Sequence, residues 1–174
     1  MEQLKDYIRS VPDFPKQGIV FRDITTLLQD AGALQKAIEA LSEPFDEEDV
    51  DLVVGIEARG FILGGAVACR LGSGFVPVRK AGKLPAETIQ KSYELEYGTD
   101  TLAMHRDAIE AGARVLMLDD LLATGGTMAA CCEMVEELGG EIVACAFLIE
   151  LSFLNGREKL DRYRIVSLVD YESE

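Results

Sequence analysis

Short apolar runs alternate along the chain with longer segments in which apolar side chains recur at helical spacing. The runs predict core strands over residues 52–56, 74–78, 114–119, 141–149 and 164–169. The segments between them predict helices over residues 4–8, 32–41, 59–71 and 126–138, with a shorter one at 156–160. Strands that alternate with helices are typical of an α/β fold, in which helices flank a mostly parallel twisted sheet.

The segment from Thr88 to Tyr97 has a different pattern, because polar and apolar residues alternate in S-Y-E-L-E-Y. This alternation predicts a strand with two distinct faces. We expect a mobile excursion after it, over residues 98–103, and a solvated acidic loop over residues 46–51. With 174 residues and no repeat or linker, the chain fits a single domain over residues 1–174.

Two carboxylates and a turn of small residues follow one predicted strand, in the run V-L-M-L-D-D-L-L-A-T-G-G-T from Val115 to Thr127. Asp119 and Asp120 stand where this strand is expected to end, and ligands bind at that edge of a parallel sheet. The turn lets backbone N–H groups converge on an anion at the start of the next helix. Its residues are Ala123, Thr124, Gly125, Gly126 and Thr127. The run therefore predicts a phosphate site with carboxylates beside it.

A phosphorylated sugar suits such a site, because carboxylates accept hydrogen bonds from its hydroxyl groups while the turn binds its phosphate. The sequence lacks the mononucleotide P-loop, G-x-x-x-x-G-K-[ST], and no G-x-G-x-x-G opens a helix, which disfavours a dinucleotide. Alternatively, Asp119 and Asp120 only cap a helix or a turn. Their coupling to A-T-G-G-T weakens this alternative.

Several stretches resemble the type I phosphoribosyltransferases, most closely their adenine-specific members. D-D-L-L-A-T-G-G-T-M resembles the family's phosphoribosyl diphosphate motif, and D-F-P-K-Q-G-I-V-F-R-D (13–23) resembles its adenine-recognition segment. G-I-E-A-R-G-F (55–61) resembles its diphosphate-binding loop. R-K-A-G-K-L-P (79–85) and Y-E-L-E-Y-G (93–98) resemble the basic segment and the active-site loop. The resemblance implies the family's fold, with residues 1–35 contributing to a small base-binding hood.

The resemblance also implies a reaction, the transfer of phosphoribose from phosphoribosyl diphosphate to N9 of adenine, which yields AMP and diphosphate in purine salvage. It implies that Asp119 and Asp120 orient the ribose hydroxyls and that the turn at 123–127 binds the 5′-phosphate. Glu96 would manage the adenine proton, and Tyr97 would cover the sugar. The expected catalytic residues are Glu96, Arg59, Asp119 and Asp120.

The resemblance implies that the diphosphate contacts two segments, through Glu57, Ala58, Arg59, Arg79, Lys80 and Lys83. A cation at a helix start opposes the macrodipole, so Arg59 favours a nearby anion. In the family the peptide bond before this arginine, here Ala58–Arg59, is commonly cis. Alternatively, Arg59 is an ordinary surface residue and R-K-A-G-K a solvated basic loop.

Adenine is expected to contact Val20, Phe21 and Arg22, with the Phe21 ring stacking on the base, an interaction worth about 1–3 kcal/mol. The residues alone favour another interpretation, in which 19–21 are ordinary apolar packing and Arg22 pairs with Asp23 at the surface. Only the resemblance reverses this preference. Thr26 departs from the family, which usually has proline there, and the change is expected to loosen the hood.

Composition limits the partners. The chain has 17 Lys and Arg against 31 Asp and Glu, a net charge of −14, so it repels nucleic acid and anionic membranes. No apolar run approaches the roughly 20 residues that span a bilayer, and the acidic N-terminus is unlike a signal peptide, so we expect a cytoplasmic protein. The four cysteines lack C-x-x-C spacing and are expected to be buried thiols.

The resemblance implies a homodimer that requires Mg²⁺, held mainly by substrate and water rather than directly by protein ligands. Two alternatives remain. One is a phosphoribosyltransferase for another base, such as hypoxanthine or xanthine. The other is a regulator that binds phosphoribosyl diphosphate without turnover, which would normally need a nucleic-acid-binding element that this sequence does not display.

Overall fold

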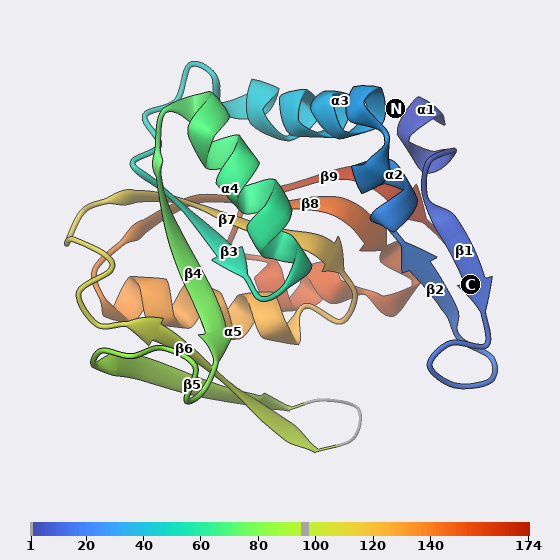
Figure 1. The fold of residues 1–174 in the computed structure, drawn as a ribbon. Helices are drawn as coiled ribbons and strands as arrows, with labels where there is room; N and C mark the ends of the chain where they lie inside the picture. The colour runs from blue at the N-terminus through green and yellow to red at the C-terminus, as the bar shows by residue number, and fades with distance from the viewer. Residues whose placement is uncertain (1, 95–97) are drawn as a thin grey trace.

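The computed structural model describes residues 2–94 and 98–174. Among these residues, a seven-stranded sheet in the order β5-β6-β4-β3-β7-β8-β9 forms the centre of the protein (Figure 1). Parallel pairing joins β3 (Leu52–Ile56), β4 (Gly74–Lys80), β7 (Arg114–Leu122), β8 (Glu141–Leu151) and β9 (Ile165–Tyr171). Antiparallel pairing adds β5 (Thr88–Glu94) and β6 (Thr99–His105) at one edge. The mostly parallel α/β fold is confirmed.

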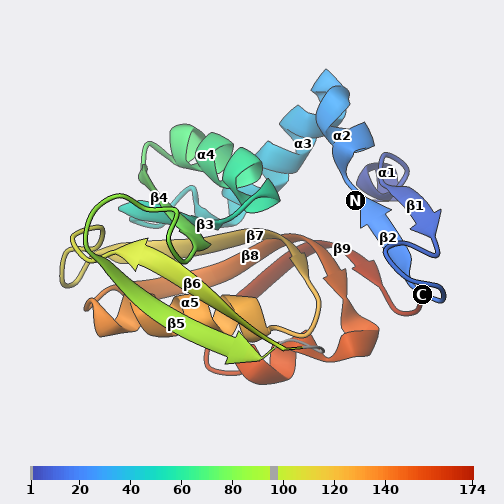
Figure 2. The same cartoon turned by 60° about the horizontal axis from the view of Figure 1, so that its bottom comes forward.

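Helices cover both faces of the sheet (Figure 2). Helices α3 (Ala31–Ser42) and α4 (Arg59–Leu71) lie on one face, and α5 (Gly126–Glu137) lies on the other. In β7, Leu116 and Leu118 pack into the core on the α3 and α4 side, whereas Val115 and Met117 pack into the core on the α5 side. These four side chains are fully buried, which is why the strand is apolar throughout residues 115–118.

A separate two-stranded sheet of β1 (Arg9–Pro12) and β2 (Val20–Asp23) lies beside the carboxyl end of β9, next to the short helices α1 (Glu2–Lys5) and α2 (Thr25–Gln29) (Figure 1). The predicted helix over residues 4–8 is therefore wrong beyond Lys5. The Thr26 hydroxyl donates to the backbone carbonyl of Tyr7 at 2.6 Å. Thr26 thus ties α2 to the chain before β1, and the expected loosening of the hood stays a prediction.

The mobile excursion predicted over residues 98–103 is wrong, because β6 occupies this segment and pairs with β5 along its whole length. Leu102, Ala103 and Met104 are buried, which supplies the stabilisation that a mobile segment would lack. Strand β7 extends to Leu122 rather than ending at residue 119, because it stays paired with β8 up to that point.

The predicted helix at 59–71 matches α4, and the predicted short helix at 156–160 is the 3₁₀ helix η3 (Gly156–Leu160). Two further 3₁₀ turns are η1 (Glu43–Phe45) and η2 (Ser152–Leu154). Three cysteines are buried as predicted, but Cys69 is exposed. Within residues 2–94 and 98–174, no helix is long and apolar enough to cross a membrane.

Candidate functional site

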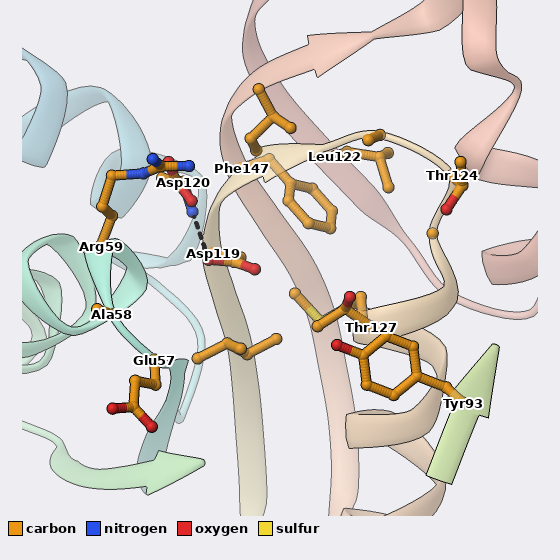
Figure 3. Close-up of a pocket in the computed structure, with 15 residues that line it drawn as sticks. Glu57, Ala58, Arg59, Tyr93, Asp119, Asp120, Leu122, Thr124, Thr127 and Phe147 are labelled. Atoms are coloured by element: carbon orange, nitrogen blue, oxygen red, sulfur yellow. Dashed lines mark hydrogen bonds and ion pairs between the residues drawn. The ribbon is translucent and has the colours of Figure 1, made fainter. Parts of the chain in front are cut away.

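A cavity of about 410 Å³ opens beyond the carboxyl end of β3, beside the last residues of β7 (Figure 3). Its walls come from the loop after β3, the start of α4, the end of β7 and the turn before α5. They include predicted residues from separate motifs, namely Glu57, Ala58, Arg59, Asp119, Asp120, Ala123, Thr124, Gly125 and Thr127. The structure therefore brings the predicted sugar, phosphate and diphosphate motifs to one place.

The turn before α5 is shaped by glycine. Gly125 has φ +77°, which favours glycine, and Gly126 begins the helix. The first N–H groups of a helix have no partner within it, so the start of α5 can bind an anion. The side chains of Thr124 and Thr127 are drawn on this turn at one side of the cavity (Figure 3). Gly126 itself does not line the cavity wall.

The two adjacent carboxylates have different partners. Asp120 forms an ion pair with Arg59, and its side chain is 8% exposed. Asp119 accepts a hydrogen bond from the Asp120 backbone N–H at 2.8 Å. Burial, reinforced by the negative charge of Asp120, raises the pKa of Asp119 well above its ordinary value. The site therefore has one carboxylate held by a cation and a second that is held by a backbone donor.

Glycine also lets helix α4 approach these carboxylates. A Cβ on Gly60 would lie 2.8 Å from Oδ1 of Asp119 and 3.3 Å from the Leu118 carbonyl oxygen, so a side chain there would displace the Asp119 carboxylate or the helix. Arg59, the first residue of α4, is carried with it. The cis peptide bond in this loop is Glu57–Ala58, one position earlier than predicted. A non-proline cis bond leaves no sequence signal by which its position could be fixed.

Arg59 connects the cavity with the hairpin of β1 and β2. Besides its ion pair with Asp120, its guanidinium carbon lies 5.2 Å from the centre of the Phe21 ring. An arginine at a helix start favours a nearby anion. In this structure Asp120 is such an anion. The presence of Arg59 at the start of α4 is therefore not by itself evidence for a bound ligand.

Glu57 forms hydrogen bonds with three residues of the predicted basic segment. Its carboxylate accepts hydrogen bonds from Arg79 Nη2 at 2.9 Å, from Lys83 Nζ at 3.0 Å and from the Lys80 backbone N–H at 3.1 Å. The hydrogen bond from Arg79 is the largest cause that lowers the pKa of Glu57 to about 2. The Lys80 ammonium instead pairs with Asp100 at 2.9 Å. Arg79, Lys80 and Lys83 stand beside the cavity and do not line it.

Replacing Glu57 with glutamine is expected to cost about 1–2 kcal/mol of unfolding free energy near pH 7, at the lower end for bonds to charged groups because Lys83 is half exposed. A lowered pKa contributes stability above the ordinary value of 4.5, and this stability is lost as the pH falls toward about 2. The difference in unfolding free energy between wild type and E57Q, measured by urea unfolding, should thus shrink below about pH 5. The exposed Glu110→Gln is the control. A gap that stays constant down to acid pH would contradict the role of this carboxylate.

The three predicted adenine residues lie outside the cavity wall, on the half-buried strand β2. The Val20 backbone N–H donates to the Glu174 carboxylate at 2.8 Å. Arg22 donates to Ser10 Oγ at 2.6 Å and to the Ser173 carbonyl at 3.3 Å. The segment 171–174 therefore already engages part of the backbone and side chains that were expected to face a base.

Other contacts fix the orientation of the hairpin. The Tyr171 ring contacts two cations, with Arg22 Cζ 4.0 Å and Lys5 Nζ 4.3 Å from its centre. Asp23 pairs with Arg9 at 2.5 Å, and this bond is the largest cause that lowers the pKa of Asp23 to about 2. The alternative interpretation, an Arg22–Asp23 surface pair, is therefore wrong. Phe21 packs edge to face on Phe14.

The sequence analysis missed several residues of the wall. Tyr93 of β5 extends toward the Thr127 side of the cavity, and Phe147 of β8 also lines it (Figure 3). The alternation in S-Y-E-L-E-Y could have assigned Tyr93 to the inner face, together with buried Ile89. Two predicted residues, Glu96 and Tyr97, lie outside the described residues.

Comparisons with known proteins agree with one another. Residues 23–172 match the phosphoribosyl transferase domain family. Adenine phosphoribosyltransferase of Geotalea daltonii is 60% identical over 98% of this chain and 100% of its own length. The crystal structure of the Thermoanaerobacter pseudethanolicus adenine phosphoribosyltransferase superposes with a TM-score of 0.95, at 55% identity, over 98% of this chain and 99% of that one. The Saccharomyces cerevisiae enzyme, in a complex that contains adenine, has a TM-score of 0.91 at 44% identity and covers 95% and 96% of the two chains.

Proposed function

The chain belongs to the adenine phosphoribosyltransferase family, and from this premise we propose that its cavity converts adenine and 5-phospho-α-D-ribose 1-diphosphate (PRPP) to AMP and diphosphate. One observation carries the proposal. The paired carboxylates Asp119 and Asp120 share a cavity with the phosphate-type turn at 123–127 and with Arg59. This set of groups matches a phosphorylated sugar that carries hydroxyls between two anionic ends.

The 5′-phosphate of PRPP binds at the start of α5, where Thr124, Gly125, Gly126 and Thr127 offer backbone N–H groups and hydroxyls. The ribose hydroxyls donate to Asp119 and Asp120. As the bond to the leaving diphosphate lengthens, positive charge develops on the ribose ring, and the two carboxylates stabilise it. Ala123 completes the turn against the sugar.

The diphosphate lies toward Glu57, Ala58 and Arg59, within reach of the cations of Arg79, Lys80 and Lys83. Glu57 holds two of these cations in place, so part of the positive charge is positioned before the donor arrives. Mg²⁺ would be held mainly by the oxygens of PRPP and by water rather than directly by protein ligands, which suits an ion that retains several of its waters. When bound, the ion neutralises charge on the leaving diphosphate.

Adenine lies against the hood, to which residues 1–35 contribute within the single domain 1–174. Phe21 stacks on the base, and the backbone of Val20 and Arg22 reads its edge. The proximity of Phe21 to Arg59 supports this assignment, since it brings the hood to the edge of the cavity. Glu96 manages the adenine proton and Tyr97 covers the sugar, which excludes the water that would hydrolyse PRPP.

We further propose that the protein works as a homodimer in the cytoplasm. The family resemblance supports the dimer. Four free cysteines suit a reducing compartment, where thiols persist unpaired. The net charge of −14 gives the protein no general affinity for nucleic acid or anionic membranes, so its partners are the small molecules adenine and PRPP.

The test is an assay of the purified protein with PRPP, Mg²⁺ and one base at a time, in which nucleotide and diphosphate are both quantified. We expect AMP and diphosphate in equal amounts with adenine, and no nucleotide with hypoxanthine, guanine or xanthine. Omission of PRPP is the control. Product from an oxopurine alone would overturn the assignment of the base. Tight binding of PRPP without product from any base would favour the regulator instead.

A further inference from the structure

The turn that is proposed to bind the 5′-phosphate packs against the start of η3, whose residues do not line the cavity. A Cβ on Gly125 would lie 2.3 Å from the carbonyl oxygen of Gly156. Conversely, a Cβ on Gly156 would lie 2.2 Å from the carbonyl oxygen of Ala123. Two backbones therefore touch here with no room for a side chain on either one. The position of residue 156 sets where the turn can lie.

Gly156 is held from both sides in sequence. Asn155, which precedes it, has φ +54° and turns the chain back after η2. Arg157, which follows it, donates from Nε to Oε1 of Glu150 at 2.6 Å and from Nη2 to Oε2 at 2.7 Å. A two-point bond of this kind fixes direction as well as distance, because the guanidinium and carboxylate planes must align. At the far end of η3, fully buried Leu160 packs into the core beside α5.

The Glu150 carboxylate, which accepts the hydrogen bonds of Arg157, is itself held in place. Glu150 lies near the end of β8 with its side chain 6% exposed, and Ser167 Oγ of β9 donates to it at 2.6 Å. Arg157 Nη2 also lies 3.1 Å from Ser167 Oγ. The anchor therefore stands on β8 and on the edge strand β9 beside it. The Arg157 side chain is 51% exposed, so its pair with the buried Glu150 carboxylate contributes less to stability than a fully buried pair would.

We propose that Arg157 is a positioning residue for the sugar donor: clamped on Glu150 and Ser167, it holds Gly156 against the turn at 123–125 and thereby fixes the phosphate-binding conformation. The side chain of Arg157 does not line the cavity, so it acts through the backbone of its neighbour. This inference rests on the proposed phosphate role of the turn. It adds a residue from a segment that the sequence motifs of the site do not include.

The test compares Arg157→Gln, Arg157→Lys and Gly156→Ala with a matched control, Arg70→Gln. Arg70 forms a similar two-point pair, with Asp46 at 2.9 and 3.0 Å, but lies at the far end of α4 from the cavity. For each protein, steady-state assays give KM for PRPP, KM for adenine and kcat. Calorimetry gives the affinity for ribose 5-phosphate, which probes the phosphate site without turnover, and thermal unfolding gives Tm.

We expect R157Q to raise both the KM for PRPP and the Kd for ribose 5-phosphate by about 10-fold, because displacements near 1 Å at a positioned group have effects of this size or larger. The KM for adenine should stay within about 2-fold. R157K should recover part of the affinity, since it keeps the charge but loses the fork. G156A should have the same signature with a larger effect. R70Q should lower Tm without changing either phosphate measurement.

The proposal is overturned if R157Q, still folded by its Tm, binds ribose 5-phosphate as wild type does. It is also overturned if the KM values for both substrates rise together, as general destabilisation would predict. If G156A fails to fold, the measurements on R157Q and R157K still test the proposal. Wild type that binds ribose 5-phosphate but makes no AMP would refute the proposed function alone, and the calorimetric comparison would still test Arg157. Wild type that does not bind ribose 5-phosphate would overturn both.

Discussion

Replacing Asp119 with asparagine is expected to lower kcat/KM for PRPP by about 100-fold or more, while the folded protein becomes more stable at neutral pH. The activity is lost because the neutral amide no longer stabilises positive charge on the ribose, and groups aimed at developing charge contribute on this scale. The fold is kept because asparagine retains the oxygen that accepts the Asp120 backbone N–H.

The gain in stability follows from the raised pKa of Asp119. Because burial and the charge of Asp120 oppose its ionisation, the folded protein binds a proton more tightly there than the unfolded chain does. The stability of wild type therefore falls as the pH rises from the ordinary value of 3.8 to the raised value. Asparagine does not titrate. The advantage of D119N should thus be absent in acid and complete above the raised pKa.

Thermal unfolding of both proteins from pH 4 to pH 8 measures this difference, and 1 kcal/mol corresponds to roughly 2–4 °C in a domain of this size. Asp107→Asn, at an exposed position, is the control for the loss of one negative charge. A D119N protein that is less stable than wild type at pH 8 would show that the folded protein does not hold this charge at a cost.

Replacing Arg59 should lower both activity and stability, unlike the replacement of Asp119, which lowers activity alone. Arg59→Gln is expected to lower kcat/KM for PRPP by about 100-fold, since a cation beside the leaving diphosphate is lost. It should also destabilise the fold by about 1–2 kcal/mol, because Asp120 loses its cation. Breaking a fully buried pair costs about 3–5 kcal/mol, but the Arg59 side chain is 40% exposed, which reduces the cost.

The double variant R59Q/D120N separates these two effects. With both charges removed, most of the stability should return in urea unfolding, whereas activity should stay as low as in R59Q or fall further. Recovery of activity together with stability would mean that Arg59 acts only by neutralising Asp120. Its proposed contact with diphosphate would then be rejected.

The central strands and the phosphate-type turn could be predicted because the sequence pattern of each lies in one continuous stretch. β3 and β7 are buried on both faces, so their apolar runs are unbroken, and A-T-G-G-T joins its glycines and hydroxyls directly. Strand β6 was missed because T-D-T-L-A-M-H mixes polar and apolar residues without a clear period. Its identity depends on β5, which pairs with it.

The partners of the charged residues could not be predicted in the same way. Glu57 and Arg79 are 22 positions apart, Arg59 and Asp120 are 61 apart, and Val20 and Glu174 are 154 apart. No local sequence pattern encodes such pairs, because their partners come together only when the strands assemble into the sheet. Sequence therefore predicted which charges gather at the strand ends, but not that Arg59 and Arg79 would each bind a carboxylate of the protein.

The hairpin at 9–23 is fastened by residues 171–174, whereas the groups proposed to bind PRPP lie between residues 57 and 127. Apart from Glu96, the residues proposed to contact adenine thus come from a different part of the chain than those proposed to bind PRPP. Substitutions in the hairpin or in the segment that fastens it can change the preferred base while the residues proposed to bind PRPP keep their contacts. A preference for a new base can therefore evolve through variants of the protein that still bind PRPP.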